Sequence, residues 1–98
     1  MTISFDGKVC VVTGAGNGLG RCHALALAER GAKVVVNDLG GARDGTGASS
    51  KAADTVVDEI IKNGGEAFSH GANVTNYEEV ADMIKQTMKR WGRIDVLI

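Results

Sequence analysis

The stretch that decides the fold is VCVVTGAGNGLG, residues 9–20. Its first four residues are apolar and mostly β-branched, as expected of a strand that is buried on both faces of a parallel sheet. Four glycines then follow within residues 14–20, so the backbone there can bend sharply and lie close to a ligand. A helix, predicted over residues 19–30, would direct its free N–H groups and positive dipole end at this turn. The stretch therefore predicts a phosphate-binding turn between a strand and a helix.

The spacing of the glycines differs from the common dinucleotide fingerprint G-x-G-x-x-G, because position 19 is Leu and position 21 is Arg. The pattern is Thr-Gly-x-x-x-Gly-x-Gly, and its glycines are Gly14, Gly18 and Gly20. Taken alone, this pattern is also compatible with a glycine-rich connection between a strand and a helix that binds no ligand.

A second strand, predicted over residues 32–38, ends in a carboxylate. It follows Gly31, which is placed to end the first helix. Asp38 lies 38 − 20 = 18 residues after Gly20, close to the roughly 20-residue offset of the acid that binds an adenosine ribose. The glycine turn and this acid point independently to a dinucleotide site.

These features resemble the short-chain dehydrogenase/reductase family over the whole length of the chain. The resemblance is carried by the Thr-Gly-x-x-x-Gly-x-Gly turn, by Asp38, and by the sequence WGRIDVLI at residues 91–98, which is similar to the entry of the family's fourth strand. Within the family, VNDLGG at residues 36–41 and the glycine-bearing segment after it are similar to the (3R)-hydroxyacyl-CoA dehydrogenase domains of multifunctional β-oxidation enzymes and their bacterial relatives.

The resemblance implies a cofactor site and its residues. The residues expected at the pyrophosphate are Gly14, Asn17, Gly18, Leu19 and Gly20. Asp38 is expected at the ribose, while Asn73 and Val74 are candidates for the adenine pocket. The family usually has Asp-Val at this last position. An Asn amide can still pair with an adenine edge through its oxygen, so an adenine contact and a purely structural role both stay open.

The charge at Asp38 favours NAD over NADP, because a carboxylate accepts hydrogen bonds from two ribose hydroxyls but repels a 2′-phosphate. Positions 15 and 17 carry Ala and Asn, so no cation stands beside the glycine turn there. Arg43 could compensate, or it could pair with Asp44 in solvent. It belongs to residues 39–49, which include four glycines and are expected to be either a flap over the adenosine or a CoA tail, or a surface insertion.

By the resemblance, the reaction is hydride transfer between the nicotinamide and a secondary alcohol or ketone, such as a 3-hydroxyacyl-CoA. The family's catalytic Ser and Tyr-x-x-x-Lys have no counterpart in these 98 residues, because Tyr77 is followed by Ala81 at the fourth position. No catalytic residue is therefore assigned, and the chain alone is expected to be inactive. The alternatives are a noncatalytic dinucleotide-binding module or assembly subunit, and, less favoured by the glycine spacing, a nucleoside-sugar epimerase.

The remaining sequence alternates helix and strand, as an α/β Rossmann-type doubly wound parallel sheet requires. A helix is predicted from the Ser49–Ser50 cap to Gly64, a strand over residues 66–70, and a helix that starts at Thr75 with a capping box to Glu78. Their predicted buried faces are Ala53, Val56, Val57, Ile60 and Ile61, and Val80, Met83, Ile84, Thr87, Met88 and Trp91. Right-handed crossovers give the strand order 3-2-1-4. Residues 1–98 are thus expected to form the amino-terminal, dinucleotide-binding part of one domain, truncated in its fourth strand.

Composition limits the partners. The chain is 44% hydrophobic and 23% charged with a formal net charge of −1, which favours neither nucleic acid nor an anionic membrane. It shows no signal peptide or membrane span, so a cytoplasmic location is expected, or a peroxisomal one if a carboxyl-terminal signal follows. Cys10 and Cys22 are expected to be packed thiols and no metal site is predicted, while His23 and His70 receive no role. A small-molecule substrate, such as an acyl-CoA, and a homo-oligomeric full-length form are also expected.

Overall fold

The computed structural model describes residues 5–16, 18–38, 51–73 and 75–98. Four parallel strands form one sheet in the order β3-β2-β1-β4, as the sequence predicts. The strands are β1 (Val9–Val12), β2 (Lys33–Asn37), β3 (Glu66–His70) and β4 (Val96–Leu97). The helices are α1 (Gly18–Glu29), α2 (Lys51–Lys62) and α3 (Tyr77–Trp91). Within the described residues, no helix is long and apolar enough to cross a bilayer.

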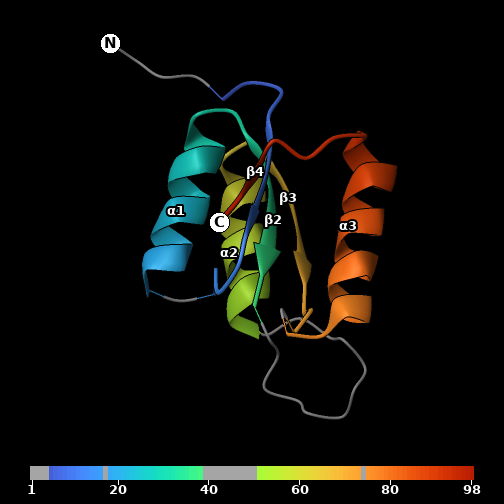
Figure 1. The fold of residues 1–98 in the computed structure, drawn as a ribbon. Helices are drawn as coiled ribbons and strands as arrows, with labels where there is room; N and C mark the ends of the chain where they lie inside the picture. The colour runs from blue at the N-terminus through green and yellow to red at the C-terminus, as the bar shows by residue number, and fades with distance from the viewer. Residues whose placement is uncertain (1–4, 17, 39–50, 74) are drawn as a thin grey trace.

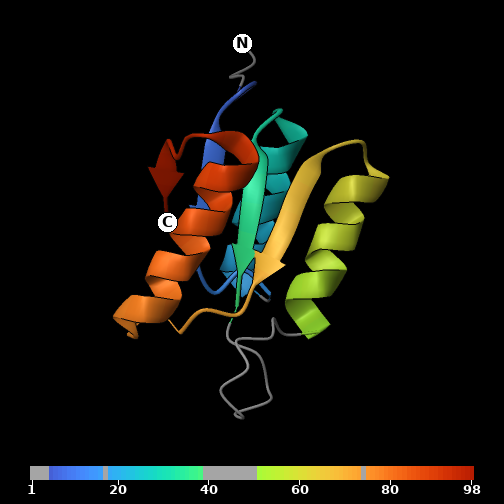
Figure 2. The same cartoon turned by 90° about the vertical axis from the view of Figure 1, so that its right-hand side faces the viewer.

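The sheet is covered on both faces. Figures 1 and 2 show α1 and α2 on one side of the strands and α3 on the other. Alternate residues of β1 divide between the two layers: Cys10 and Val12 pack with the α1 and α2 core, whereas Val11 packs with Met83 of α3. Because both faces are buried, the strands are continuously apolar rather than alternating. This burial confirms the prediction made from residues 9–12.

The predicted buried faces of α2 and α3 were too wide. Ile61 is 53% exposed, and Ile84 and Met88 are 39% and 45% exposed. Successive residues of an α-helix are about 100° apart, so Ile61 stands well to one side of the buried Ile60. In α3, the buried residues are Met83 and Thr87, and the exposed pair comes one position after each of them.

The start of α3 also differs from the predicted capping box. Asn76 is the N-cap, and its side-chain oxygen accepts hydrogen bonds from the N–H groups of Glu78 and Glu79. The Thr75 hydroxyl instead donates to the side-chain oxygen of Asn73, at 2.7 Å. The helix therefore begins at Tyr77. Asn is at least as favourable as Thr at the N-cap position, and Asn76 lies one residue nearer to the apolar face of the helix. The predicted cap of α2 at Ser49–Ser50 falls outside the described residues.

Candidate cofactor site

The carboxyl ends of β1, β2 and β3 lie at one edge of the sheet, at the lower end of the molecule in Figure 1. Residues 13–16 follow β1, Asp38 follows β2, and residues 71–73 follow β3. In parallel α/β sheets, ligands bind outside the carboxyl ends of the strands, where the strand order reverses. β1 lies between β2 and β4, which is this reversal point.

The glycine turn uses its glycines in two ways. Gly14 and Gly18 have φ angles of +62° and +59°, which residues with a Cβ rarely adopt. Gly20 is required for a different reason, because a Cβ built on it would lie 2.2 Å from the carbonyl oxygen of Gly14. The start of α1 can thus approach the turn closely. Leu19 follows Gly18 in the first turn of α1, and this residue is 77% exposed.

Gly16 is a site residue that the sequence analysis did not assign. A Cβ built on it would lie 2.2 Å from Oδ2 of Asp38 and 3.1 Å from the Cβ of Ala52. The carboxylate predicted to bind ribose therefore lies directly against the glycine turn. Gly16 is not one of the glycines of the Thr-Gly-x-x-x-Gly-x-Gly pattern. In the sequence, only its position between β1 and α1 could have indicated this contact.

Asn37 is a second residue that the sequence analysis did not assign. It is the last residue of β2 and is only 2% exposed. Its side-chain Nδ2 donates to the carbonyl oxygens of His70 and Ala72, at 3.0 and 3.1 Å, and its own carbonyl accepts from the N–H of Ala15, at 2.8 Å. Asn37 thus connects the turns after β1 and β3. The signal that could have indicated Asn37 in the sequence is a polar amide residue at the end of an otherwise apolar strand.

His70 has a clear structural partner on each side of its ring. Nδ1 accepts a hydrogen bond from the N–H of Ala72, at 3.1 Å, and Nε2 lies 2.8 Å from Oδ2 of Asp82 on α3. Because Nδ1 is the acceptor, Nε2 carries the proton in the neutral ring, and this N–H donates a hydrogen bond to the carboxylate of Asp82. This hydrogen bond is the main cause that lowers the pKa of Asp82, and a hydrogen bond from Gln86 acts in the same direction.

Asn73 lies at the expected edge, but its side-chain oxygen is already engaged. That oxygen accepts from the N–H of Thr75, at 3.0 Å, and from the Thr75 hydroxyl, at 2.7 Å. The N–H of Asn73 donates to Oε1 of Glu79, at 3.2 Å. In this conformation, the Asn73 side chain offers a ligand its NH₂ group rather than the oxygen considered from the sequence.

Four expectations concern residues whose structure is not described. Asn17, Val74 and the 39–49 segment, which includes Arg43, fall outside the described residues. The prediction that both cysteines are packed is confirmed for Cys10, which is buried in β1, and is wrong for Cys22, which is exposed on α1. Burial, followed by the charge of Asp95, raises the pKa of the Cys10 thiol.

Among the described residues, no group of three His, Cys, Asp or Glu side chains is arranged to hold a metal ion.

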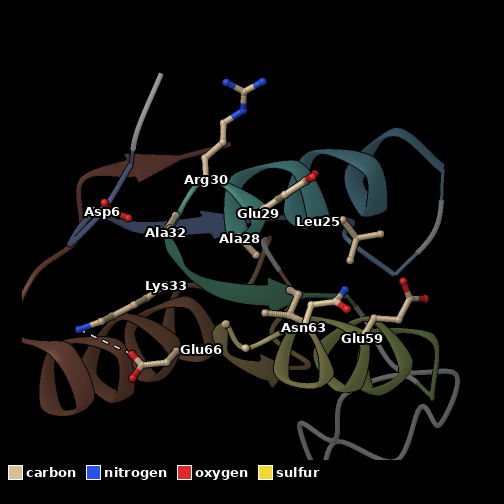
Figure 3. A pocket seen from close by; sticks show the side chains of 14 residues that line it. Asp6, Leu25, Ala28, Glu29, Arg30, Ala32, Lys33, Glu59, Asn63 and Glu66 are labelled. Carbon is tan, nitrogen blue, oxygen red and sulfur yellow. Dashed lines mark ion pairs between the residues drawn. The ribbon is translucent and has the colours of Figure 1, made fainter. Parts of the chain in front are cut away.

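A separate hollow lies at the other end of the sheet, where β2 and β3 begin (Figure 3). Side chains of both charges line it, including Glu59, Arg30 and Lys33, and Lys33 pairs with Glu66 at 3.7 Å. It lies away from the carboxyl ends of the strands and shares no residue with the glycine turn, so it is not part of the candidate cofactor site.

A family model described as short chain dehydrogenase matches residues 8–98. The chain is 57% identical over 99 residues to the peroxisomal multifunctional enzyme type 2 of Drosophila melanogaster, covering 98% of this chain and 16% of that protein. It is 52% identical over 91 residues to the 3-oxoacyl-[acyl-carrier-protein] reductase of Synechocystis sp., covering 93% of this chain and 34% of that protein. The chain thus spans at most about a third of the length of these two relatives.

Solved structures agree with the arrangement of strands and helices. A short chain dehydrogenase from Mycobacterium avium matches with a TM-score of 0.85 and 48% identity, over 99% of this chain and 34% of that one. A 7α-hydroxysteroid dehydrogenase complexed with NADH and 7-oxo glycochenodeoxycholic acid matches with a TM-score of 0.83 and 34% identity, over 98% of this chain and 34% of that one.

Proposed function

Because the chain belongs to the short-chain dehydrogenase family, we propose that it forms the NAD-binding part of an oxidoreductase that acts on a secondary alcohol or ketone. The bound nicotinamide would supply the hydride acceptor or donor. The residues of this chain would bind and orient the dinucleotide. Gly14, Gly18, Leu19 and Gly20 would line the pyrophosphate side, together with Asn17.

The observation that carries the choice of NAD is the contact between Asp38 and Gly16. The carboxylate lies at the end of β2 and against the glycine turn, so it stands next to the place where a phosphate-linked ribose would lie. A carboxylate there accepts hydrogen bonds from the 2′- and 3′-hydroxyls and repels a 2′-phosphate. The neighbour solved with NADH supports a nicotinamide dinucleotide as the cofactor class.

The pyrophosphate assignment is supported by the start of α1. This helix begins at Gly18, and its first turn contains no acidic residue that would repel an anion. The close approach of Gly20 to the Gly14 carbonyl leaves no side chain between the helix end and the turn. Free N–H groups and the helix dipole would therefore act on the phosphates directly.

For the substrate, we propose a 3-hydroxyacyl or 3-oxoacyl thioester, such as a 3-hydroxyacyl-CoA. Support comes from the relative in Synechocystis sp., whose name describes a reductase of 3-oxoacyl-[acyl-carrier-protein]. By resemblance to the family, the proton donor would be the Tyr of a Tyr-x-x-x-Lys pair, and Tyr77 does not fit it, because Ala81 rather than a Lys stands four residues later. We therefore expect the 98-residue chain to bind NAD without oxidising an alcohol.

The test is isothermal titration of the chain with NAD and with NADP, on wild type and on Asp38→Ala. We expect saturable binding of NAD, weaker binding of NADP, and a loss of about ten- to a hundredfold in NAD affinity in the variant. Asp58→Ala, on the exposed side of α2, is the matched control and should bind NAD as wild type does. No NAD binding by a folded wild-type chain, or equal binding by Asp38→Ala, would contradict the assignment.

The proposal extends to compartment and assembly. We place the protein in the cytoplasm, with the peroxisome as the alternative, which the name of the Drosophila relative supports. The location of a fluorescent fusion of the full-length protein tests the proposed compartment. We also propose a homo-oligomeric full-length form, which sedimentation of that product would test.

A further inference from the structure

We propose that His70 is a positioning residue for adenine recognition, and this inference rests on the proposed binding of NAD. The ring of His70 would hold residues 71–73 in the shape that receives the adenine. The sequence offered no reason to assign it this role.

The order of the strands indicates which part of the dinucleotide would meet this turn. The proposed pyrophosphate site follows β1, and the proposed ribose acid, Asp38, follows β2. β3 is the next strand outward in the sheet, and the N–H of Asp38 donates to the carbonyl of His70, at 3.3 Å. A dinucleotide that runs from β1 to β2 would therefore continue with its adenine at the turn after β3.

His70 controls the shape of that turn through Ala72. The N–H of Ala72 donates to Nδ1 of His70, while the carbonyl of Ala72 accepts from Nδ2 of Asn37. Ala72 is only 1% exposed. Its bond from Asn37 is buried, and its bond to His70 is partly buried. The residue immediately before Asn73 is thus fixed from two strands.

Asp82 on α3 fixes the ring itself. The His70 side chain is 10% exposed, and its Nε2 lies 2.8 Å from the Asp82 carboxylate, which keeps Nδ1 free to accept from Ala72. The bond from Ala72 to His70 joins a side-chain acceptor to the N–H two residues later. This is the hydrogen bond of an Asx turn, made here by an imidazole instead of an Asn side chain.

That equivalence provides a matched pair of variants. In His70→Asn, the amide oxygen stands near the position of Nδ1, so the bond from Ala72 is kept and the contact with Asp82 is lost. In His70→Gln, the longer side chain carries its NH₂ near the position of Nε2, so the contact with Asp82 is kept and the acceptor for Ala72 is lost. The two variants therefore separate the positioning bond from the pair that supports it.

The experiment measures dissociation constants for NAD and for nicotinamide hypoxanthine dinucleotide, which differs from NAD in its purine edge. We expect His70→Gln to weaken NAD binding by about five- to tenfold, the effect of one hydrogen bond, and to bring the ratio of the two constants closer to one. His70→Asn should keep the wild-type ratio. A variant that is merely destabilised would not change this ratio.

Hydrogen exchange at the Ala72 amide gives a second measurement, made without nucleotide. Exchange should accelerate in His70→Gln and stay slow in His70→Asn. If both variants keep the wild-type NAD affinity and ratio, the positioning role is overturned while the proposed cofactor stands. If the wild-type chain binds no NAD, the proposed function fails, and the role of His70 fails with it.

Discussion

Asp95 and Val9 are joined by two hydrogen bonds. The N–H of Val9 donates to Oδ2 of Asp95, and the N–H of Asp95 donates to the carbonyl of Val9, both at 2.8 Å. Arg93 binds the same carboxylate through Nε and an NH₂ group. This arrangement attaches the segment before β4 to the start of β1, the strand that leads into the glycine turn.

The Asp95 contact should make stability depend on pH. The hydrogen bond from Arg93, followed by that from the Val9 N–H, lowers the pKa of Asp95 in the folded chain. The contribution of Asp95 is therefore fully present above its unfolded pKa of about 3.9 and is lost as the pH falls through the lower folded pKa. Asp95→Asn should lower the thermal midpoint at neutral pH, and the difference from wild type should shrink in acid. A constant difference from pH 7 to pH 2 would contradict this.

Gly16→Ala should weaken NAD binding by displacing the Asp38 carboxylate, because the added Cβ would lie 2.2 Å from Oδ2. A loss of about tenfold is expected, the lower end of the effect of a hydrogen bond to a charged group. Titration calorimetry on a double-mutant cycle gives the cleanest measurement. In the Asp38→Ala background, Gly16→Ala should have little further effect, and fully additive losses would show that the two residues act separately.

Gly20→Ala should be more destabilising than Gly18→Ala. At Gly20 the new Cβ would meet the Gly14 carbonyl at 2.2 Å, and the contact is with backbone that cannot rotate away. At Gly18 no atom lies within 4 Å of such a Cβ, so only the positive φ angle opposes the change. Urea unfolding should give a cost of about 1–2 kcal/mol for Gly18→Ala and about 3 kcal/mol for Gly20→Ala. The reverse order would contradict the close approach of α1 to the turn.

Asn37→Val should be destabilising although Val fits the β-branched pattern of its strand. The substitution removes the donor to the carbonyls of His70 and Ala72, and the second of these bonds is buried. The carbonyl of His70 keeps the N–H of Asp38 as a donor, but the buried carbonyl of Ala72 loses the amide donor. This loss should cost about 1–3 kcal/mol in the free energy of unfolding. Chemical denaturation measures this, with Val36→Ile in the same strand as a packing control. A variant as stable as wild type would show that the amide is dispensable.

Much of the fold could be predicted because it depends on the period and length of apolar runs. VCVV and KVVVN place β1 and β2, and Glu66–His70 is the third strand as predicted. The strand order followed from right-handed crossovers in a doubly wound sheet. The widths of the helix faces could not be predicted as well, because the exposure of Ile61 and Met88 depends on how each helix is rotated against the sheet.

Site residues could be predicted from the sequence only where the local backbone or a known spacing requires one residue type. Gly14 and Gly18 need a positive φ angle, and the distance of Asp38 from Gly20 follows a known spacing. Gly16 and Asn37 act through contacts with segments that are distant in sequence, and the ring of His70 is held by Asp82 of the following helix. Such contacts leave no periodic signal, so the three residues became evident only in the folded chain.

The link between Thr13 and Ile98 has a kinetic consequence. The N–H and hydroxyl of Thr13 both donate to the carbonyl of Ile98, at 2.8 Å, across 85 positions of sequence. Contacts of such wide separation are slow to form, because the chain must first lose the entropy of closing a long loop. The pairings of β1 with β2 and of β2 with β3 join much nearer residues. Refolding should therefore assemble these three strands before β4 docks, so that the first residue of the glycine turn becomes anchored at the end of the folding reaction.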